Sequence, residues 1–128
     1  MISYDIINNY IDCCIGSNGS HFDISLVIYN ILKDEYRYIG NNIWEYKNND
    51  DWLIDEKNVR LKYSIKSTVN NFFIERSKYW IEKTNDNDIN IEIDNKLKSL
   101  KILQFSNKLK DDKFILQIIK EVKQFYDK

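Results

Sequence analysis

The chain has 128 residues, a formal net charge of −1 and 43% hydrophobic residues. This length suits one domain with a hydrophobic core, and the near-zero charge gives no general signal for binding a polyanion. No apolar run approaches the roughly 18 residues of a membrane-spanning helix. The first ten residues, MISYDIINNY, lack the basic start and small-residue cleavage site of a signal peptide. We therefore expect one domain that neither crosses a membrane nor is secreted.

The cysteine and histidine content predicts neither a disulfide framework nor a metal site. Cys13 and Cys14 are the only cysteines and are adjacent, so a bridge between them would be strained. Two free thiols on a helix indicate a reducing, cytoplasmic compartment. His21 is the only histidine, and one His with no cysteine or carboxylate cluster beside it makes no recognisable zinc site. We expect no metal and no cofactor.

Residues 1–15 are predicted to form an N-terminal helix. Apolar side chains recur there at intervals of three and four residues: Ile6, Ile7, Tyr10, Ile11 and Cys14. The segment GSNGS at 16–20 holds two of the three glycines of the chain and ends this helix. We take residues 1–15 as an N-terminal helix and residues 16–128 as a single helical domain.

A second helix, followed by an aromatic β-hairpin, is predicted next. Ser20 with Asp23 three residues later is typical of a capping box, and the run ISLVIYNIL after it is apolar on nearly all sides, as in a buried helix. The hairpin spans about 35–54. Its two aromatic runs flank Gly-Asn-Asn at 40–42, residues that tolerate the positive φ of tight turns. Residues 52–54 are predicted to add a short third strand.

Three helices complete the predicted fold. One runs over about 58–83, and the polar segment TNDNDIN at 84–90 breaks it. The next covers roughly 91–110, with the following residues on one face: Ile93, Leu97, Leu100 and Leu103 or Gln104. Asp111-Asp112 caps the last helix, whose apolar stripe comprises Ile115, Ile118, Ile119, Val122, Phe125 and Tyr126. The fold class is therefore α+β, mostly α: about five helices with one inserted aromatic hairpin, in a winged-helix-like arrangement.

The sequence holds no recognisable catalytic motif. It has no nucleophile elbow, phosphate-binding loop or metal-ligand spacing. Its paired carboxylates, Asp50-Asp51 and Asp111-Asp112, stand where turns and helix caps are expected. A two-metal site would need carboxylates on neighbouring strands, and no such pattern is visible. We expect no catalytic residue within this chain.

Binding to nucleic acid is the chemistry that remains. Lysines recur from Lys96 to Lys110 with no acid among them, which fits either a solvated helix face or a patch that contacts phosphates. Basic residues on the hairpin and at the start of the long helix are the candidate nucleic-acid-binding residues: Arg37, Lys47, Arg60, Lys62 and Lys66. Because arginine is scarce in this chain, contact with the DNA backbone is expected rather than base reading.

The order of short motifs between Phe22 and Lys128 resembles that of a known family. The family has an aromatic residue and then an LKD segment, which are here Tyr29 and Leu32-Lys33-Asp34. An aromatic strand and an Asn-rich turn follow, here Tyr36-Arg37-Tyr38 and Asn41-Asn42. Two tryptophans come next, Trp44 and Trp52, and then a helix that starts with Arg60-Leu61 and has a later serine, Ser64 or Ser67. The C-terminal stretch FSNKLKDDKFILQIIKEVKQFYDK also resembles the family's last helix. The family is the domain that precedes the superfamily 3 helicase in poxvirus-type and giant-virus DNA primase-helicases and in related phage and plasmid replication proteins.

The resemblance implies a non-catalytic adapter, or collar, ahead of an ATP-dependent helicase that assembles as a ring. Its partners would be the helicase domain of the same polypeptide and further copies in the ring, with DNA as an additional contact. One departure bears on DNA. Where the family often has a Gly and a basic residue before the second tryptophan, this chain reads Asn48-Asn49-Asp50-Asp51, whose carboxylates would repel phosphates. The alternative is a winged-helix-like DNA-binding module that acts independently.

Overall fold

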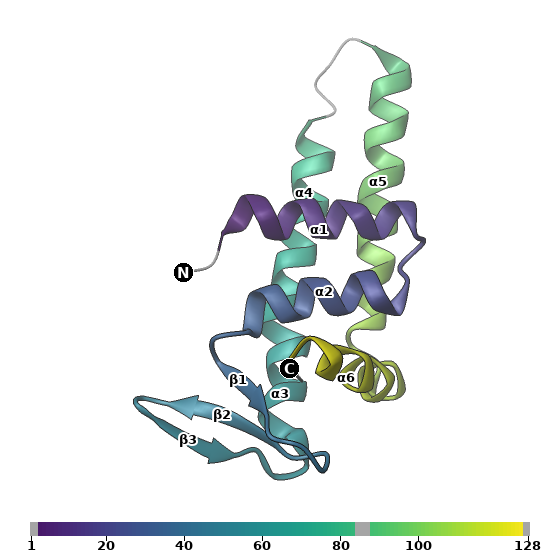
Figure 1. Cartoon of the computed structure of the whole chain (residues 1–128). Coiled ribbons are helices and arrows are strands. Elements are labelled where there is room, and N and C mark those ends of the chain that lie inside the picture. Colours follow the sequence, from purple (N-terminus) through teal and green to yellow (C-terminus); the bar gives the residue numbers. More distant parts are fainter. Residues whose placement is uncertain (1–2, 84–87, 127–128) are drawn as a thin grey trace.

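A computed structural model describes residues 3–83 and 88–126 of the chain. Over these ranges the fold is α+β and mostly α, as the sequence predicts, and it contains five helices and one three-stranded sheet. The elements follow one another in this order (Figure 1): α1 (Tyr4–Gly16), α2 (His21–Leu32), β1 (Tyr36–Tyr38), β2 (Trp44–Asn48), β3 (Asp51–Ile54), the 3₁₀ turn η1 (Glu56–Asn58), α3 (Val59–Ser64), the π-helical stretch η2 (Ile65–Val69), α4 (Asn70–Glu82), α5 (Ile89–Lys108) and α6 (Asp112–Tyr126). The segments α3, η2 and α4 count as one helix because they run on without a break, and they are called the α3–α4 rod below.

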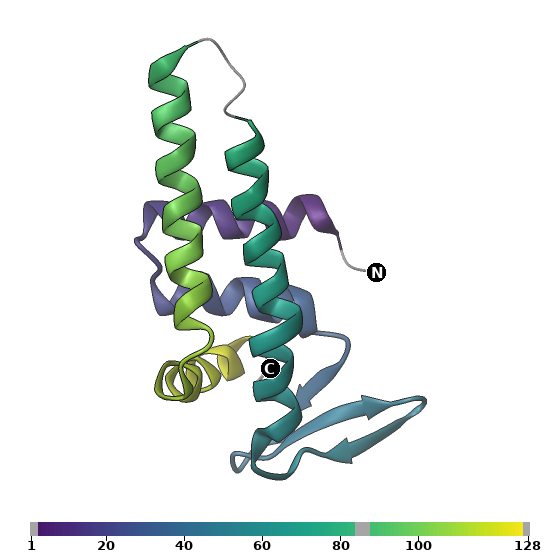
Figure 2. The same cartoon turned by 180° about the vertical axis from the view of Figure 1, so that it is seen from behind.

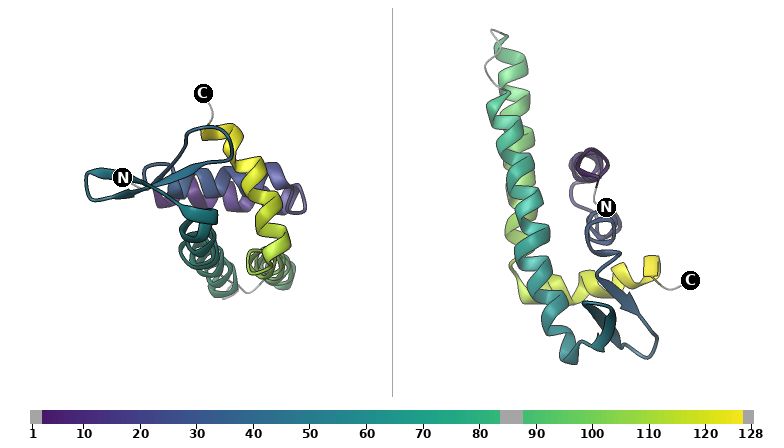
Figure 3. Two further views of the ribbon diagram at one scale, coloured as in Figure 1. Left: turned by 90° about the horizontal axis from the view of Figure 1, so that it is seen from below. Right: turned by 90° about the vertical axis from the view of Figure 1, so that its left-hand side faces the viewer.

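The α3–α4 rod and α5 form a long antiparallel helical hairpin, and everything else packs on one side of it. Helices α1 and α2 lie across that side (Figure 1). The right-hand view of Figure 3 shows that α4 and α5 extend well beyond α1, whereas α6 and the sheet lie at the other end of the hairpin. Seen from behind, no other described helix or strand covers the opposite side (Figure 2). The long hairpin therefore has one packed side and one bare side.

Two helices begin on the side-chain caps that the sequence predicts. Ser20 Oγ accepts a hydrogen bond from the Asp23 backbone N–H (3.2 Å), at the start of α2. Asp111 Oδ2 accepts one from the Phe114 N–H (3.1 Å), at the start of α6. Each cap satisfies a backbone donor that has no partner inside the first turn. Residues 84–87, most of the predicted break between α4 and α5, lie outside the described residues.

The aromatic hairpin is part of a three-stranded antiparallel meander in the order β1-β2-β3, so the predicted third strand is confirmed. Its turn at 40–42 has three consecutive residues with positive φ. Tyr36 pairs with Tyr46 and Tyr38 with Trp44, which places four aromatic rings on one face of the sheet. Tyr36 and Trp44 are buried. This face packs on the helices and leaves the other face to solvent.

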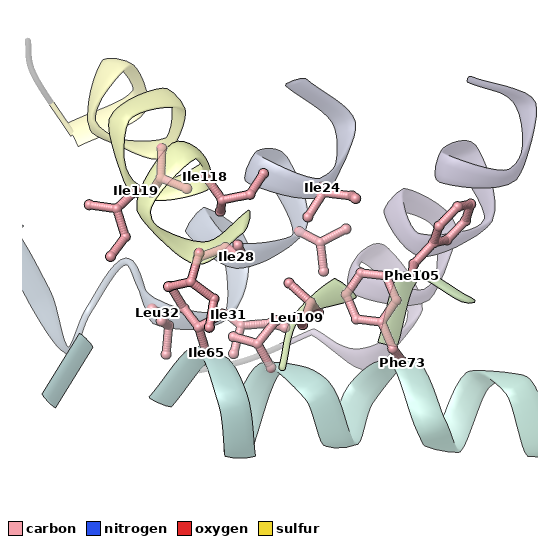
Figure 4. Packing of buried hydrophobic residues seen from close by; sticks show 14 of the residues in the cluster. Ile24, Ile28, Ile31, Leu32, Ile65, Phe73, Phe105, Leu109, Ile118 and Ile119 are labelled. Carbon is pink, nitrogen blue, oxygen red and sulfur yellow. The ribbon is translucent and has the colours of Figure 1, made fainter. Parts of the chain in front are cut away.

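A continuous hydrophobic core lies where α2, α6, α5 and the α3–α4 rod meet. Figure 4 shows side chains from all four: Ile24, Ile28, Ile31, Leu32, Ile65, Phe73, Phe105, Leu109, Ile118 and Ile119. Helix α1 adds Ile7, Ile11 and Cys14 to the same core. Burial raises the pKa of Cys14 to about 12, so this thiol stays protonated and unreactive near neutral pH.

Candidate interaction surfaces

The outer face of the sheet carries two of the five candidate nucleic-acid-binding residues. Arg37 Nε donates a hydrogen bond to Glu45 Oε1 (2.6 Å), and its guanidinium lies 4.6 Å from the centre of the Trp52 ring. Lys47 is exposed on the same face, two residues beyond Glu45 on β2. A phosphate would therefore have to compete for Arg37 with the Glu45 carboxylate and the Trp52 indole, which already contact its guanidinium.

Arg60 lies on the aromatic side of the sheet instead. Its guanidinium is 4.2 Å from the centre of the Tyr46 ring, and its carbonyl accepts a hydrogen bond from the Tyr36 hydroxyl (2.9 Å). The Asp55 carboxylate accepts hydrogen bonds from the backbone N–H groups of Arg60 (2.9 Å) and Leu61 (2.8 Å). Asp55 thus caps α3, although it lies five and six residues before the two N–H groups that it accepts from. No capping motif predicts this spacing from the sequence. Together these contacts tie the sheet to the start of the rod.

Lys62 and Lys66 face the start of α6. Lys66 Nζ donates to Asp112 Oδ1 (2.5 Å) in an exposed ion pair. This hydrogen bond, with a smaller contribution from Lys62, holds the pKa of Asp112 below its ordinary value. The structure therefore brings Arg37 together with Lys47, and Lys62 together with Lys66, but it divides the five residues among three places.

An ion pair joins α1 to α4. Arg76 donates from Nε and Nη2 to the two oxygens of Asp12 (3.0 and 2.5 Å), and Trp80 Nε1 donates to the same carboxylate (3.0 Å). The hydrogen bonds to Asp12 raise the pKa of Arg76. Because three donors satisfy one carboxylate, this cluster fixes the crossing of α1 over the hairpin and leaves no group free for chemistry.

An open groove of about 390 Å³ lies beside this ion pair, between α1 and α4. Tyr4 and Phe72 stack within its lining, with ring centres 5.4 Å apart, and Tyr79 lines it as well. Two charged residues also line the groove: Arg76, which is already paired with Asp12, and the exposed Glu75. The groove therefore offers aromatic surface, but it has no arrangement typical of catalysis.

Small polar side chains form the contact of α5 with α4. The Ser77 and Ser99 hydroxyls hydrogen-bond each other (2.7 Å), and the Ser106 hydroxyl donates to Asn70 Oδ1. Asn95 Nδ2 donates to the carbonyl of Lys83, the residue that follows α4 (3.3 Å). All five side chains are buried. The buried side of α5 therefore combines two core residues, Ile102 and Phe105, with a polar row whose side chains hydrogen-bond within the protein.

The opposite side of α5 carries an exposed aliphatic stripe, called the outer stripe below. Its members are 40–66% exposed: Ile89, Ile93, Leu97, Leu100 and Leu103. Lys101 Nζ contacts Asn18 in the α1–α2 connection (2.8 Å), and Ser99 contacts α4. Since successive residues are about 100° apart on a helix, the outer stripe points away from both of these neighbours. On the sides of α5 away from these neighbours, no other described helix or strand is seen from behind (Figure 2).

Lysines border the outer stripe. Lys96 pairs with Glu92 and Lys98 with Asp94, each at 3.2 Å and one helical turn apart. Lys98 also lies 4.3 Å from the centre of the Trp80 ring. These contacts match a solvated helix face for this part of the lysine run.

Comparison with known proteins identifies no relative: no protein family, no curated protein and no solved structure matches the chain. Among residues 3–83 and 88–126, no group of three or more His, Cys, Asp and Glu side chains is placed to hold a metal ion. None of the helices in these ranges is both long and apolar enough to cross a bilayer. Function must therefore be inferred from the surfaces described above.

Proposed function

We propose that this chain is a non-catalytic adapter domain that binds other proteins, ahead of a ring-forming replicative helicase in the cytoplasm. The observation that carries the protein-binding part is the outer stripe. Contiguous aliphatic surface in water is unfavourable, and free energy is gained when another apolar surface covers it. A polyanion such as DNA has no apolar surface of this kind to offer.

The helicase part of the proposal is supported by the order of motifs from Phe22 to Lys128, which resembles the domain ahead of superfamily 3 helicases. On this proposal the first partner is the helicase domain of the same polypeptide, and the second is further copies in the ring. The ATPase chemistry would belong to the helicase, and this chain would position it.

DNA contact is a minor part of the proposal, because most of the candidate basic groups are already engaged. Arg37 is held by Glu45, Arg60 lies over Tyr46, and Lys66 is paired. We expect weak binding of the isolated chain to forked or single-stranded DNA. The alternative, an independent DNA-binding module, predicts binding that falls steeply with salt and that Lys62→Glu with Lys66→Glu abolishes. A mobility-shift titration over salt separates the two.

Deletion tests the helicase role. Residues 22–128 are removed from the natural polypeptide that carries the helicase, and hexamer formation and unwinding are measured. The proposal expects both to be impaired, because the adapter holds neighbouring helicases together. A single exposed change on α6, Leu116→Lys, serves as the control and should leave both unchanged. Normal hexamers and normal unwinding after the deletion would contradict the proposal.

A further inference from the structure

The spacing along the outer stripe is that of a helix that pairs with another helix. Three members of the stripe, Ile93, Leu97 and Leu100, and then Gln104, which is polar and lies beyond the stripe, follow one another at steps of four, three and four residues. This is the alternation of the two core positions in a heptad, with a mean period of 3.5 residues. The three aliphatic members are exposed in the isolated chain. The stripe therefore has the pattern of half of a two-helix seam.

We propose that the outer stripe pairs with the same stripe of a second copy of this chain, in an antiparallel arrangement with twofold symmetry. Leu97 of one copy lies opposite Leu100 of the other, and Ile93 lies opposite Gln104. The twofold axis passes between Leu97 and Leu100 of each helix, so the Leu97–Leu100 layer and the Ile93–Gln104 layer each occur twice. The occupant of the bare side of the hairpin is thus a second molecule of the same sequence.

Charges beside the seam select this orientation and register. In an antiparallel pair, positions on the same flank of the two helices meet. Here the register sets Asp94 of each copy beside Lys101 of the other, which gives two attractive contacts. On the opposite flank Lys96 meets the aliphatic Leu103. No like charges meet across the seam among the described residues.

Other arrangements bring like charges together. A parallel pair would set Lys96 of each copy beside Lys101 of the other. Shifting the antiparallel register by one heptad in one direction sets Lys101 against Lys101, and a shift of one heptad in the other direction sets Asp94 against Asp94. Like charges at such positions are destabilising. Of these four arrangements, only the antiparallel register proposed above brings opposite charges of the two α5 helices together.

The area is also sufficient for a pair. Five side chains that are 40–66% exposed leave apolar surface on the order of 500 Å² on each copy, so the pair buries on the order of 1,000 Å², near the lower limit for a specific interface. Pairing exchanges the contacts of Asp94 with Lys98 and of Lys101 with Asn18 for contacts between copies. Exposed contacts of this kind contribute little, so the exchange costs little.

This pairing rests on the same outer stripe as the protein-binding part of the proposed function, but it does not depend on the helicase part. It concerns the isolated chain, and it is measured without helicase or DNA. It can therefore fail while the adapter role stands, and the adapter role can fail while the pairing stands.

The first test is the molar mass of the intact chain in solution, measured by sedimentation equilibrium over a range of concentrations. The wild type should be a dimer that dissociates on dilution. Leu97→Lys should be a monomer with unchanged helical circular dichroism, because its charge would be buried at the centre of the seam. Leu116→Lys, on the exposed side of α6, is the matched control and should dimerise like the wild type. A wild type that is monomeric throughout, or a dimer that tolerates Leu97→Lys, would overturn the proposal.

Charge exchange tests the register. Asp94→Lys alone and Lys101→Asp alone each replace two attractive contacts with two repulsive ones, and each should weaken dimerisation about tenfold. The double variant Asp94→Lys/Lys101→Asp restores opposite charges across the seam, so its dissociation constant should return to within about threefold of the wild type. A double variant as weak as the singles would overturn this register.

Discussion

Helices α5 and α6 are neighbours in the chain, yet they distribute polarity in opposite ways. Helix α6 turns four of its five aliphatic side chains to the core: Ile115, Ile118, Ile119 and Val122. Helix α5 turns serines and asparagines toward α4 and leaves Leu97 and Leu100 in solvent. Helix α5 also buries Ile102 and Phe105, but its outer stripe has no partner among the described residues. The contrast indicates that α6 stabilises the fold, whereas the outer stripe of α5 is kept for a partner.

The largest expected effect comes from α6. Ile118→Ala opens a cavity in the core and should lower the free energy of unfolding by about 2–5 kcal/mol. The matched change on α5, Leu97→Ala, should alter it by less than about 0.5 kcal/mol when the chain is monomeric. Urea unfolding at a concentration below dimerisation gives both values. Equal losses would remove the distinction between the two helices.

The polar contact of α5 with α4 should matter next. Asn70→Ala leaves the buried Ser106 hydroxyl without its partner, so the free energy of unfolding should fall by about 1–3 kcal/mol. Asn107→Ala changes an exposed amide on α5, next to Ser106, and serves as the control, with an expected change under about 0.5 kcal/mol. Both are measured by urea unfolding. No loss for Asn70→Ala would mean that the inner side of α5 tolerates unpaired polar groups.

The buried side of α6 should also respond to alkali. Burial raises the pKa of Tyr126 above its ordinary value of 10.0. The unfolded chain therefore ionises first, so the stability that this group contributes is complete below pH 10 and declines as pH rises above it. Cys14, whose pKa burial raises from 9.0 to about 12, adds to the same decline from about pH 9 upward.

The variant Tyr126→Phe isolates the contribution of α6. The Tyr126 hydroxyl has no hydrogen-bond partner among the described residues, so the change should be nearly neutral at pH 7, within about 0.5 kcal/mol. Above pH 10 the variant should lose less stability than the wild type in a pH series of urea unfolding. Tyr63→Phe, at an exposed position, should leave the series unchanged. Identical pH profiles for wild type and Tyr126→Phe would contradict this account.

The smallest expected effect separates the two roles of Asp94. In the Leu97→Lys background, Asp94→Asn removes the exposed pair with Lys98 and any pair with the lysine introduced three residues on, and it should change the free energy of unfolding by less than about 0.5 kcal/mol. In the dimer, the same change also removes the contact with Lys101 of the second copy, so dimerisation should weaken. A loss above about 1 kcal/mol in the monomer would show that Asp94 stabilises the single chain instead.

Local rules predicted much of this fold from the sequence. Helical spacing predicted α6 and its buried side, Ser20 and Asp111 were expected as caps, and aromatic runs around Gly40-Asn41-Asn42 predicted the hairpin. Each of these signals depends on neighbours in the chain, which is why it can be read without a structure. The spacing on α5 predicted an apolar face, but not that Ser99 and Ser106 would occupy the inner side.

The surfaces were harder to predict, because they depend on which elements meet. Nothing in the sequence shows that Arg37 and Arg60 lie on different sides of the sheet until the strand pairing is known. Asp55 reaches the start of α3 through a turn, with no characteristic spacing. On α5 a signal did exist: an aliphatic stripe opposite a line of serines. Its direction could be inferred only once α4 was seen to contact the serines.

Disulfide trapping between copies tests the proposed seam most directly. In a Cys13→Ser background, which removes the exposed native thiol, Leu97→Cys and Leu100→Cys chains are mixed, oxidised gently and analysed by intact mass. Because Leu97 and Leu100 share a layer across the twofold axis, the mixed covalent dimer should exceed either homodimer, while a Leu97→Cys with Leu116→Cys mixture should yield little. No covalent dimer, or homodimers as abundant as the mixed species, would contradict the antiparallel pairing of α5.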